Sequence, residues 1–444
     1  MELSMIGHSS VIFRDGTSGI GILCDPWLSG RVFNNGWAQS PESVLSPRDL
    51  DGVTHLFISH EHPDHLHFPS LKSFPAAFKE RVVIVFQKLH ERKVPDALAK
   101  LGYRNIRCLA HLEELKINDQ FSIYIYQHRH LDSALLIKSG SRFYVNLNDA
   151  ELSYAECTHL RRRFGDCDLL LTQFSIAGSD GVDDLLPAAG EAVLEKVLQQ
   201  ADALHARTVV PFASFMYFCS PDNAHLNQYL NKVVDVKRRL QDRKLRCHLL
   251  FPGSSLADVD HINTEDDEAR FTSHEQSAEK TMFPLEPAVP AAELISVIED
   301  RIARWKMHFP SFLIGKMGTV VVWVPDLDRR LKVNFPAGTA TETDEPALMQ
   351  IHSQPLKFAF AEPFGIQTLG VSGRYRLERL THQWRTVRIV SSLHNAGISL
   401  TARGLLSSSF LRWAWSRRSN VLGNVAQQYH RFFASSSGRG VPER

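Results

Sequence analysis

The sequence has little of what marks secreted, membrane-embedded or nucleic-acid-binding proteins. Its six cysteines are scattered without a Cys-x-x-Cys pair, which argues against a disulfide framework and favours a reducing cytoplasm. No apolar run approaches the roughly 20 residues of a membrane helix, and the first residues lack the order of a signal peptide. The 50 basic and 49 acidic side chains nearly cancel. We therefore expect a cytoplasmic protein with no nucleic-acid partner and no integral membrane segment.

Length and composition predict a globular protein with two domains. The hydrophobic content of 43% and the charged content of 22% are typical of globular proteins, and 444 residues is long for one domain. A polar stretch rich in aspartate and glutamate divides the chain. We predict a catalytic domain over residues 1–258, a linker over residues 259–287 and a C-terminal α+β domain over residues 288–444.

A cluster of potential metal ligands follows a predicted buried strand at residues 54–58. The cluster contains His60, His62, Asp64 and His65. Alternate residues of a strand point to the same side, so His60 and His62 can reach one metal ion. The proline between His62 and Asp64 turns the chain, so that Asp64 and His65 can face a second ion. A lone histidine on an apolar strand is usually a core residue, but four such groups within six positions favour metal binding.

Later strand ends offer the ligands that a site for two metal ions still requires. A predicted strand at residues 121–127 ends in His128 and His130, and a predicted hairpin ends beside Asp149. Either histidine could complete the coordination of one ion, and a carboxylate has two oxygens that can bridge both ions. His225, near the start of a predicted helix over residues 222–240, is a further candidate ligand. Its alternative role is a surface or pocket-lining residue.

The spacing His-x-His-x-Asp-His after a strand resembles the signature of the metallo-β-lactamase superfamily. This resemblance implies an α/β fold, a four-layer αββα sandwich in which two mixed sheets pack together between helices. It also implies that His128, rather than His130, is the ligand and that Asp149 is the bridging carboxylate. By position, His8 and Asp25 are similar to the glycine-histidine and aspartate-proline elements of the lactonase-like and amino-sugar hydroxylase-like branches. We predict Asp64, Asp25 and His8 as catalytic. The alternatives are a surface histidine and a turn aspartate.

Further segments narrow the resemblance to one branch. Residues 25–30, 35–37, 168–179, 209–215 and 252–258 are similar in order and spacing to the catalytic domain of CMP-N-acetylneuraminate hydroxylase and its bacterial relatives. The resemblance covers about residues 1–260. It implies an iron-dependent hydroxylation of a nucleotide-linked N-acetyl sugar, whose phosphates would suit Arg31 or Arg129.

The chain departs from those hydroxylases in two respects. Their Rieske [2Fe–2S] ligands come as Cys-x-His followed by Cys-x-x-His, whereas Cys108 with His111 and Cys157 with His159 stand in the reverse order. We therefore expect the electrons to come from a separate ferredoxin or reductase. Many hydrolases of the superfamily also place a histidine just after the strand predicted here at residues 208–212, where this chain has none.

Two functions share the predicted ligands. An iron-dependent hydroxylase and a zinc-dependent hydrolase of an ester, lactone or phosphodiester both hold two divalent metal ions in imidazole and carboxylate. We favour iron and hydroxylation, with zinc and hydrolysis as the alternative. A metal-free scaffold is disfavoured because the whole signature is present.

The remaining expectations concern secondary structure. We predict helices at residues 69–79, 90–101, 290–309, 405–415 and 421–433, and strands at residues 82–86, 246–251, 320–324, 331–335, 358–360 and 384–390.

Overall fold

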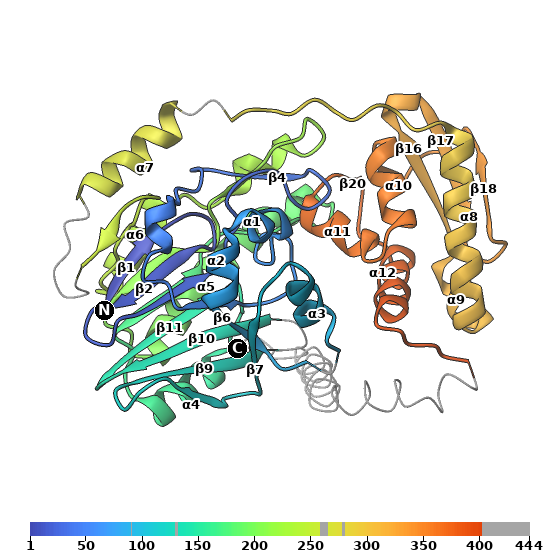
Figure 1. The fold of residues 1–444 in the computed structure, drawn as a ribbon. Helices are drawn as coiled ribbons and strands as arrows, with labels where there is room; N and C mark the ends of the chain where they lie inside the picture. The colour runs from blue at the N-terminus through green and yellow to red at the C-terminus, as the bar shows by residue number, and fades with distance from the viewer. Residues whose placement is uncertain (90, 129–131, 258–264, 278–279, 402–444) are drawn as a thin grey trace, which may run out of the picture. The chain divides into compact units, whose positions relative to one another are not determined.

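The computed structural model describes the chain except residues 90, 129–131, 258–264, 278–279 and 402–444 (Figure 1). It divides into two compact units. The first comprises Met1–Leu285 together with Gly370–Arg374, and the second comprises Glu286–Leu369 and Tyr375–Arg444. Among the described helices, none is both long enough and apolar enough to cross a membrane.

The first unit contains two large sheets. One has seven strands in the order β15 (Ser255–Leu256), β1 (Glu2–Met5), β2 (Val11–Asp15), β3 (Ile20–Cys24), β5 (His55–Ile58), β6 (Val83–Gln87) and β7 (Asn105–Leu109). The other has six strands in the order β13 (Val209–Phe212), β12 (Leu169–Gln173), β11 (Arg142–Asn148), β10 (Asp132–Ser139), β9 (Phe121–His128) and β8 (Glu114–Lys116). Both sheets are mixed, with parallel neighbours β3, β5, β6 and β7 in the first and β11, β12 and β13 in the second. A small two-stranded sheet pairs β4 (Trp37–Gln39) with β14 (Met216–Phe218).

The two large sheets share one hydrophobic core. Phe13 and Phe57 of the first sheet and Leu135 and Val145 of the second belong to the same buried cluster. A second cluster lies on the other face of the seven-stranded sheet, because alternate strand residues point to opposite faces. The helices of the first unit are α1 (Phe68–Ser73), α2 (Ala76–Arg81), α3 (Lys93–Lys100), α4 (Tyr154–Phe164), α5 (Leu186–Ala203), α6 (Val233–Asp242) and α7 (Glu265–Ser277), with 3-10 turns η1 (Pro47–Leu50), η2 (Asp183–Leu185) and η3 (Ala224–Tyr229).

The predicted α/β sandwich is therefore confirmed. Side chains of α1, α2 and α3 pack on the outer cluster of the seven-stranded sheet, and side chains of α4, α5 and α6 join the core of the six-stranded sheet. Helix α4 illustrates how local sequence sets an element. Ser153 and Glu156 form a reciprocal capping box at its start, and Gly165 ends it with a φ of 94° that glycine adopts without strain.

Several predicted elements of the first unit are wrong. The helix expected at residues 69–79 is interrupted at Phe74, because the residue before a proline is driven out of helical geometry. The helix expected at residues 222–240 breaks where Leu230 becomes extended, which separates η3 from α6. Residues 246–251 do not close the sheet; within the described part of this stretch Cys247 makes one bridge to Val209, and β15 forms the sheet edge beside β1.

The predicted linker is also wrong in part. Helix α7 lies within residues 259–287, and its Phe271 is 2% exposed in the core of the first unit. Phe271 stacks on Phe215 with ring centroids 5.3 Å apart. One large apolar residue in a polar helix gives no periodic signal, which explains why the sequence pattern indicates a linker.

The second unit is a smaller α+β assembly. Its five-stranded sheet has the order β18 (Thr339–Glu342), β17 (Arg329–Asn334), β16 (Thr319–Val324), β19 (Met349–Gln350) and β20 (Arg376–Leu377). Its helices are α8 (Ala291–His308), α9 (Ser311–Met317), α10 (Ser353–Ala361), α11 (Gly365–Ser372) and α12 (His382–Asn395), with the 3-10 turn η4 (Pro325–Leu327); the last residues of α11 belong to the first unit.

The strands predicted at residues 358–360 and 384–390 are wrong, because these residues lie in α10 and α12. In α12 the buried residues Trp384, Val387 and Val390 are three apart, which suits one face of a helix, and the Thr381 side chain caps its first turn. The helix predicted at residues 290–309 corresponds to α8. The helices predicted at residues 405–415 and 421–433 lie outside the described residues.

Candidate metal centre

The loop after β5 turns back on itself and brings its potential ligands together. The backbone N–H groups of His65 and Leu66 both donate to the carbonyl of His62, at 3.0 and 2.7 Å. The Nε2 atom of His60 lies 2.8 Å from Nδ1 of His62. The two imidazoles therefore lie side by side, and the turn returns the chain toward them.

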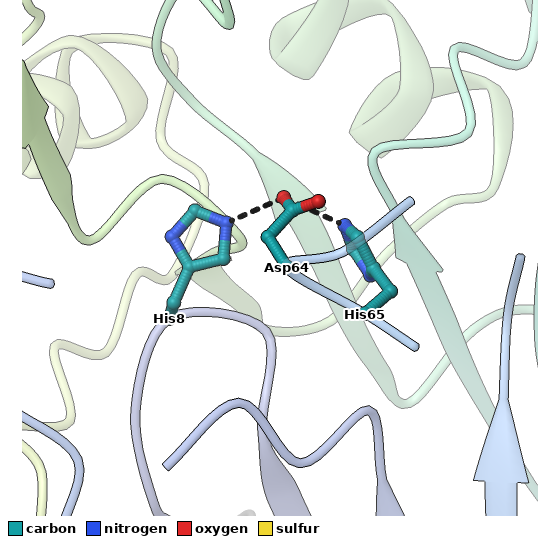
Figure 2. A group of neighbouring side chains, drawn as sticks. All are labelled: His8, Asp64 and His65. Carbon is teal, nitrogen blue, oxygen red and sulfur yellow. Dashed lines mark ion pairs between the residues drawn. The ribbon is translucent and has the colours of Figure 1, made fainter. Parts of the chain in front are cut away.

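One group of potential ligands comprises His8, Asp64 and His65 (Figure 2). The Oδ2 atom of Asp64 lies 3.3 Å from Nε2 of His8 and 3.3 Å from Nε2 of His65, so the carboxylate stands between the two rings. All three residues are buried. His8 comes from the loop between β1 and β2, and its carbonyl accepts a 2.9 Å hydrogen bond from Ala213 N just after β13.

A second group comprises His60, His65 and Asp149. The Oδ2 atom of Asp149 lies 3.5 Å from Nε2 of His60 and 3.6 Å from Nε2 of His65. Asp149 follows β11 directly, and Asn148 before it has a left-handed φ of 58°. His65 belongs to both groups, so the two groups are adjacent.

Asp25 holds His65 from behind. Its Oδ2 atom lies 3.0 Å from Nδ1 of His65 and accepts from Ser59 Oγ at 2.7 Å and from the amide of Asn148. Its Oδ1 atom accepts from Ser59 N at 2.8 Å. Asp25 is 0% exposed, so it is placed to fix the orientation of His65 rather than to contact a substrate.

His128, at the end of β9, is held in a similar way. Its Nδ1 atom lies 3.1 Å from Oε1 of Glu156 on α4. The ring is 5% exposed, and its Nε2 atom has no hydrogen-bond partner among the described residues. A carboxylate on one ring nitrogen leaves the other free to bind a metal ion.

At His60 and Asp64, the surrounding charges and burial favour the protonation state that binds a metal ion. Burial lowers the pKa of His60, and the neighbouring His65 and His62 lower it further, so its ring is neutral. Burial raises the pKa of Asp64, but His65 and His8 outweigh burial and hold that pKa well below its usual range. Burial lowers the pKa of His65, but Asp64, Asp149 and Asp25 outweigh burial and raise it well above the usual value. A metal ion would replace the proton on His65.

The residues present fit a pair of metal ions. Buried polar atoms without a hydrogen-bond partner are costly, and in native proteins such atoms mark an ion or water. In the part of the chain that the structure describes, five of them lie on the potential ligands, namely His8 Nδ1, Asp64 Oδ1, His65 Nε2, His128 Nε2 and Asp149 Oδ1. Imidazole and carboxylate donors suit zinc and iron alike. The buried histidine and aspartate groups are therefore consistent with a dinuclear metal site.

Aromatic side chains form a packed wall beside both groups. The ring centroid of Phe33 lies 5.9 Å from that of His62, and the centroid of Trp37 lies 6.4 Å from that of His8. Trp27 makes an edge contact with His8 at 5.4 Å. Phe33, Trp37 and Trp27 are at most 6% exposed, so this wall (Trp27, Phe33 and Trp37) keeps water away from the imidazoles.

Other predicted residues lie elsewhere. His225 Nε2 is 3.3 Å from Asp183 Oδ1, and in the described part of the chain it belongs to neither ligand group. Arg31 stacks on the ring of Phe283 at 4.5 Å. Arg129 lies outside the described residues.

The sequence analysis missed some of the contributors. Ser59 and Asn148, which hold Asp25, carry no motif signal of their own, although both stand at strand ends beside predicted ligands. His8 was predicted as catalytic, whereas the structure places it among potential ligands. It approaches the end of β13, where many hydrolases carry the histidine that this chain lacks.

Residues 2–213 match the family model described as "Beta-lactamase superfamily domain". This part of the chain is thus a metallo-β-lactamase superfamily domain. A protein of Mycobacterium tuberculosis (strain H37Rv) is 27% identical in an alignment 248 positions long, which covers 51% of this chain and 46% of that protein. A protein of Mycolicibacterium smegmatis is 27% identical in an alignment 284 positions long, which covers 57% of this chain and 53% of that protein. Both are provisionally named Rieske 2Fe-2S iron-sulfur proteins, and the chain spans about half the length of these curated relatives.

Solved structures similar to this chain include enzymes of two chemical classes. CmlA, a diiron β-hydroxylase from Streptomyces venezuelae, is 17% identical with a TM-score of 0.41, and the similarity covers 57% of this chain and 53% of that one. An isothiocyanate hydrolase from Delia radicum gut bacteria is 17% identical with a TM-score of 0.43, and the similarity covers 58% of this chain and 99% of that one.

Proposed function

We propose that this protein is a dinuclear metalloenzyme that hydroxylates a small molecule with two iron ions and an external electron donor. The observation that carries the proposal is the pair of buried ligand groups that share His65 and contain only imidazole and carboxylate donors. Such donors hold iron in the oxidation states that oxygen chemistry requires. The substrate class we propose is a nucleotide-linked N-acetyl sugar or a similar small molecule.

The residues of the chain have distinct parts in this proposal. His8, Asp64 and His65 would hold one ion, and His60, His62 and Asp149 would hold the other together with His65. His128, with Glu156 behind it, would add an imidazole. When bound, iron ions would supply oxygen activation, and zinc ions in their place would supply Lewis acidity.

Asp25 and the aromatic wall support that arrangement. The Asp25 carboxylate fixes the ring of His65, so that its Nε2 atom faces both ligand groups. The wall excludes water from one side of the imidazoles, which strengthens their electrostatic interactions.

An external donor follows from the electron count. Inserting one atom of O₂ into a C–H bond, with the other atom leaving as water, consumes two electrons. The described residues place no cysteine in either ligand group, and burial raises the pKa of Cys157 to about 12, which disfavours its thiolate. The curated relatives are provisionally named iron–sulfur proteins, which supports an electron-transfer partner for this domain. We propose that a separate ferredoxin or reductase supplies the two electrons.

A zinc-dependent hydrolase is the second candidate. His8 favours it, because its backbone carbonyl is hydrogen-bonded to Ala213 N just after β13, where many hydrolases of the superfamily carry a histidine. The absence of a histidine at that strand end therefore does not by itself argue for oxidation. The hydrolase would act on an ester, lactone or phosphodiester.

One experiment separates the two candidates. The protein is purified from iron-supplemented and zinc-supplemented cultures, and its metal content is measured for each. The iron form is mixed with nucleotide-linked N-acetyl sugars in air, with and without a ferredoxin and its reductase. The zinc form is assayed under nitrogen with ester, lactone and phosphodiester substrates. The His60→Ala/His62→Ala double variant serves as the control in every assay.

The two candidates predict opposite results. If the protein is a hydroxylase, chemically reduced iron should support a single turnover. Turnover should continue only when the electron donor is supplied. Sustained hydrolysis by the zinc form without oxygen or reductant would overturn the oxidative proposal in favour of the hydrolase. A double variant with wild-type metal content would overturn the site itself.

A further inference from the structure

Three consecutive residues near the metal centre hold an unusual backbone conformation. Phe33, Asn34 and Asn35 have φ angles of 51°, 52° and 56°. Asparagine tolerates this left-handed region, but phenylalanine rarely adopts it. A run of three such residues persists only when the surrounding structure fixes it. We call Phe33–Asn35 the left-handed turn.

Arg374 is bonded to this turn from a distant part of the sequence. Its Nη1 atom donates to the carbonyl of Asn34 at 2.8 Å. Its Nε atom lies 2.9 Å from Oδ2 and 3.1 Å from Oδ1 of Asp222. The side chains of Arg374 and Asp222 are 1% and 5% exposed, so the ion pair is buried. The rigid fork of a guanidinium can serve a carboxylate and a carbonyl at once, which an ammonium group cannot do with the same geometry.

The residues before Arg374 add bonds to the same region of the first unit. The indole N–H of Trp37 donates to the carbonyl of Val371 at 2.9 Å. The Asn223 amide donates to the carbonyls of Ser372 at 2.7 Å and Gly36 at 2.9 Å. One amide thus joins Gly36, which directly follows the left-handed turn, to the Gly370–Arg374 segment.

Small residues let the segment approach closely. A Cβ atom at Gly36 would lie 2.8 Å from the Cβ atom of Ser372. A Cβ atom at Gly178 would overlap the carbonyl oxygen of Gly370, which accepts a 2.7 Å bond from Ser179 N. The absence of a side chain at Gly36 and Gly178 therefore allows the Gly370–Arg374 segment to pack closely against them.

The left-handed turn contacts the candidate metal centre through the side chain of its first residue. Phe33, its first residue, contacts the ring of His62, and it packs on Trp37 with centroids 4.7 Å apart. Trp37 in turn lies against His8. The wall thus contacts a histidine of the signature and a histidine of the first ligand group.

We propose that Arg374 is a positioning residue for the metal centre. It fixes the left-handed turn, and the turn holds Phe33 against His62 and Trp37 beside His8. The hydrogen bonds described for the Arg374 side chain go to Asp222 and Asn34, so we propose that it acts on the ligand groups through these two aromatic side chains. The proposal rests on the proposed metal site, and it is independent of the choice between hydroxylation and hydrolysis.

The test measures how fast the protein loses metal. Wild type and the variants Arg374→Lys and Arg374→Met are loaded with zinc, and its release to a chelator is followed with a colorimetric indicator. Arg376→Met is the matched control, because Arg376 is exposed two residues further along the chain. Circular dichroism monitors the fold of each variant. Arg374→Lys is the milder change, since it keeps the positive charge beside Asp222 but loses the fork.

We expect Arg374→Lys to retain the fold and to release zinc up to about tenfold faster than wild type, because Arg374 lies further from the ligands than the directly bonded partners whose loss changes metal affinity by about 10- to 100-fold. Arg374→Met should release zinc faster still, and Arg376→Met should match wild type. Zinc release at the wild-type rate from Arg374→Lys would overturn the positioning role of Arg374 and would leave the proposed function standing. A wild-type protein that takes up no metal would overturn the proposed function and this role with it.

Discussion

Asp25 Oδ2 lies 3.0 Å from His65 Nδ1, so a fully buried carboxylate fixes the one histidine that both ligand groups share. Both oxygens of this carboxylate accept hydrogen bonds from the chain. In the proposed metal centre, the orientation of His65 therefore depends on a residue that lies behind the ligands.

Asp25→Asn should weaken metal binding by about 10- to 100-fold. An amide cannot replace this carboxylate, because its NH₂ group would face a hydrogen-bond donor at either oxygen position. Isothermal titration of the metal-free protein with zinc measures the change. Asp51→Asn is the control at an exposed aspartate and should bind zinc as wild type does. Equal affinity of Asp25→Asn and wild type would show that His65 needs no carboxylate behind it.

His65→Ala should remove metal from both groups, whereas His8→Ala should remove it from one. The reason is that His65 belongs to both groups and His8 to one. Elemental analysis of the purified variants gives the metal content per chain. If both variants lost the same amount of metal, His65 would not be shared.

Phe271→Ala should destabilise the first unit by about 3 kcal/mol, the usual cost of removing a buried phenylalanine ring. The Phe271 ring packs against Phe215 and Phe251, with centroids 5.3 and 4.9 Å away. Urea unfolding measures the loss. Phe68→Ala, at a ring that is 41% exposed, should cost less than about 1 kcal/mol. Equal midpoints for Phe271→Ala and wild type would mean that α7 does not contribute to the core.

His55 should make the protein less stable as the pH falls from 6.5 toward 4. Burial lowers the pKa of His55 in the folded protein to about 4, whereas an unfolded histidine has a pKa of about 6.5. In that window the unfolded chain binds a proton that the folded chain excludes, so stability is complete above it and declines within it.

The effect can be isolated with His55→Gln, which does not titrate. Between pH 7 and pH 5 wild type should lose about 2 kcal/mol more than this variant, measured by urea unfolding with a chelator present. His159→Gln, at an exposed histidine, should follow wild type. If His55→Gln and wild type declined equally, the folded protein would accommodate a charged His55.

The sequence predicts those parts of the site that one short segment contains. His60, His62, Asp64 and His65 follow a strand at fixed spacing, and β5 is found where it is expected. The two mixed sheets are also confirmed, because their strands are apolar and bounded by turn residues.

The remaining parts depend on contacts between distant positions. Arg374 and Asp222 are 152 positions apart, and neither has a local pattern that predicts an ion pair. His8 is visible in the sequence, but its place in a ligand group arises only when the loop after β1 meets the end of β13. The strands expected within α10 and α12 fail because β-rich composition is a weaker signal than the spacing of the buried residues.

The first unit is discontinuous, since Gly370–Arg374 are separated from its other residues by residues 286–369. A ribosome makes those intervening residues first, so the nascent first unit exists for a time without Arg374. The residues of both ligand groups, the last of which is Asp149, have by then already emerged. The order of synthesis thus delivers the metal ligands well before the residue that fixes the turn beside them.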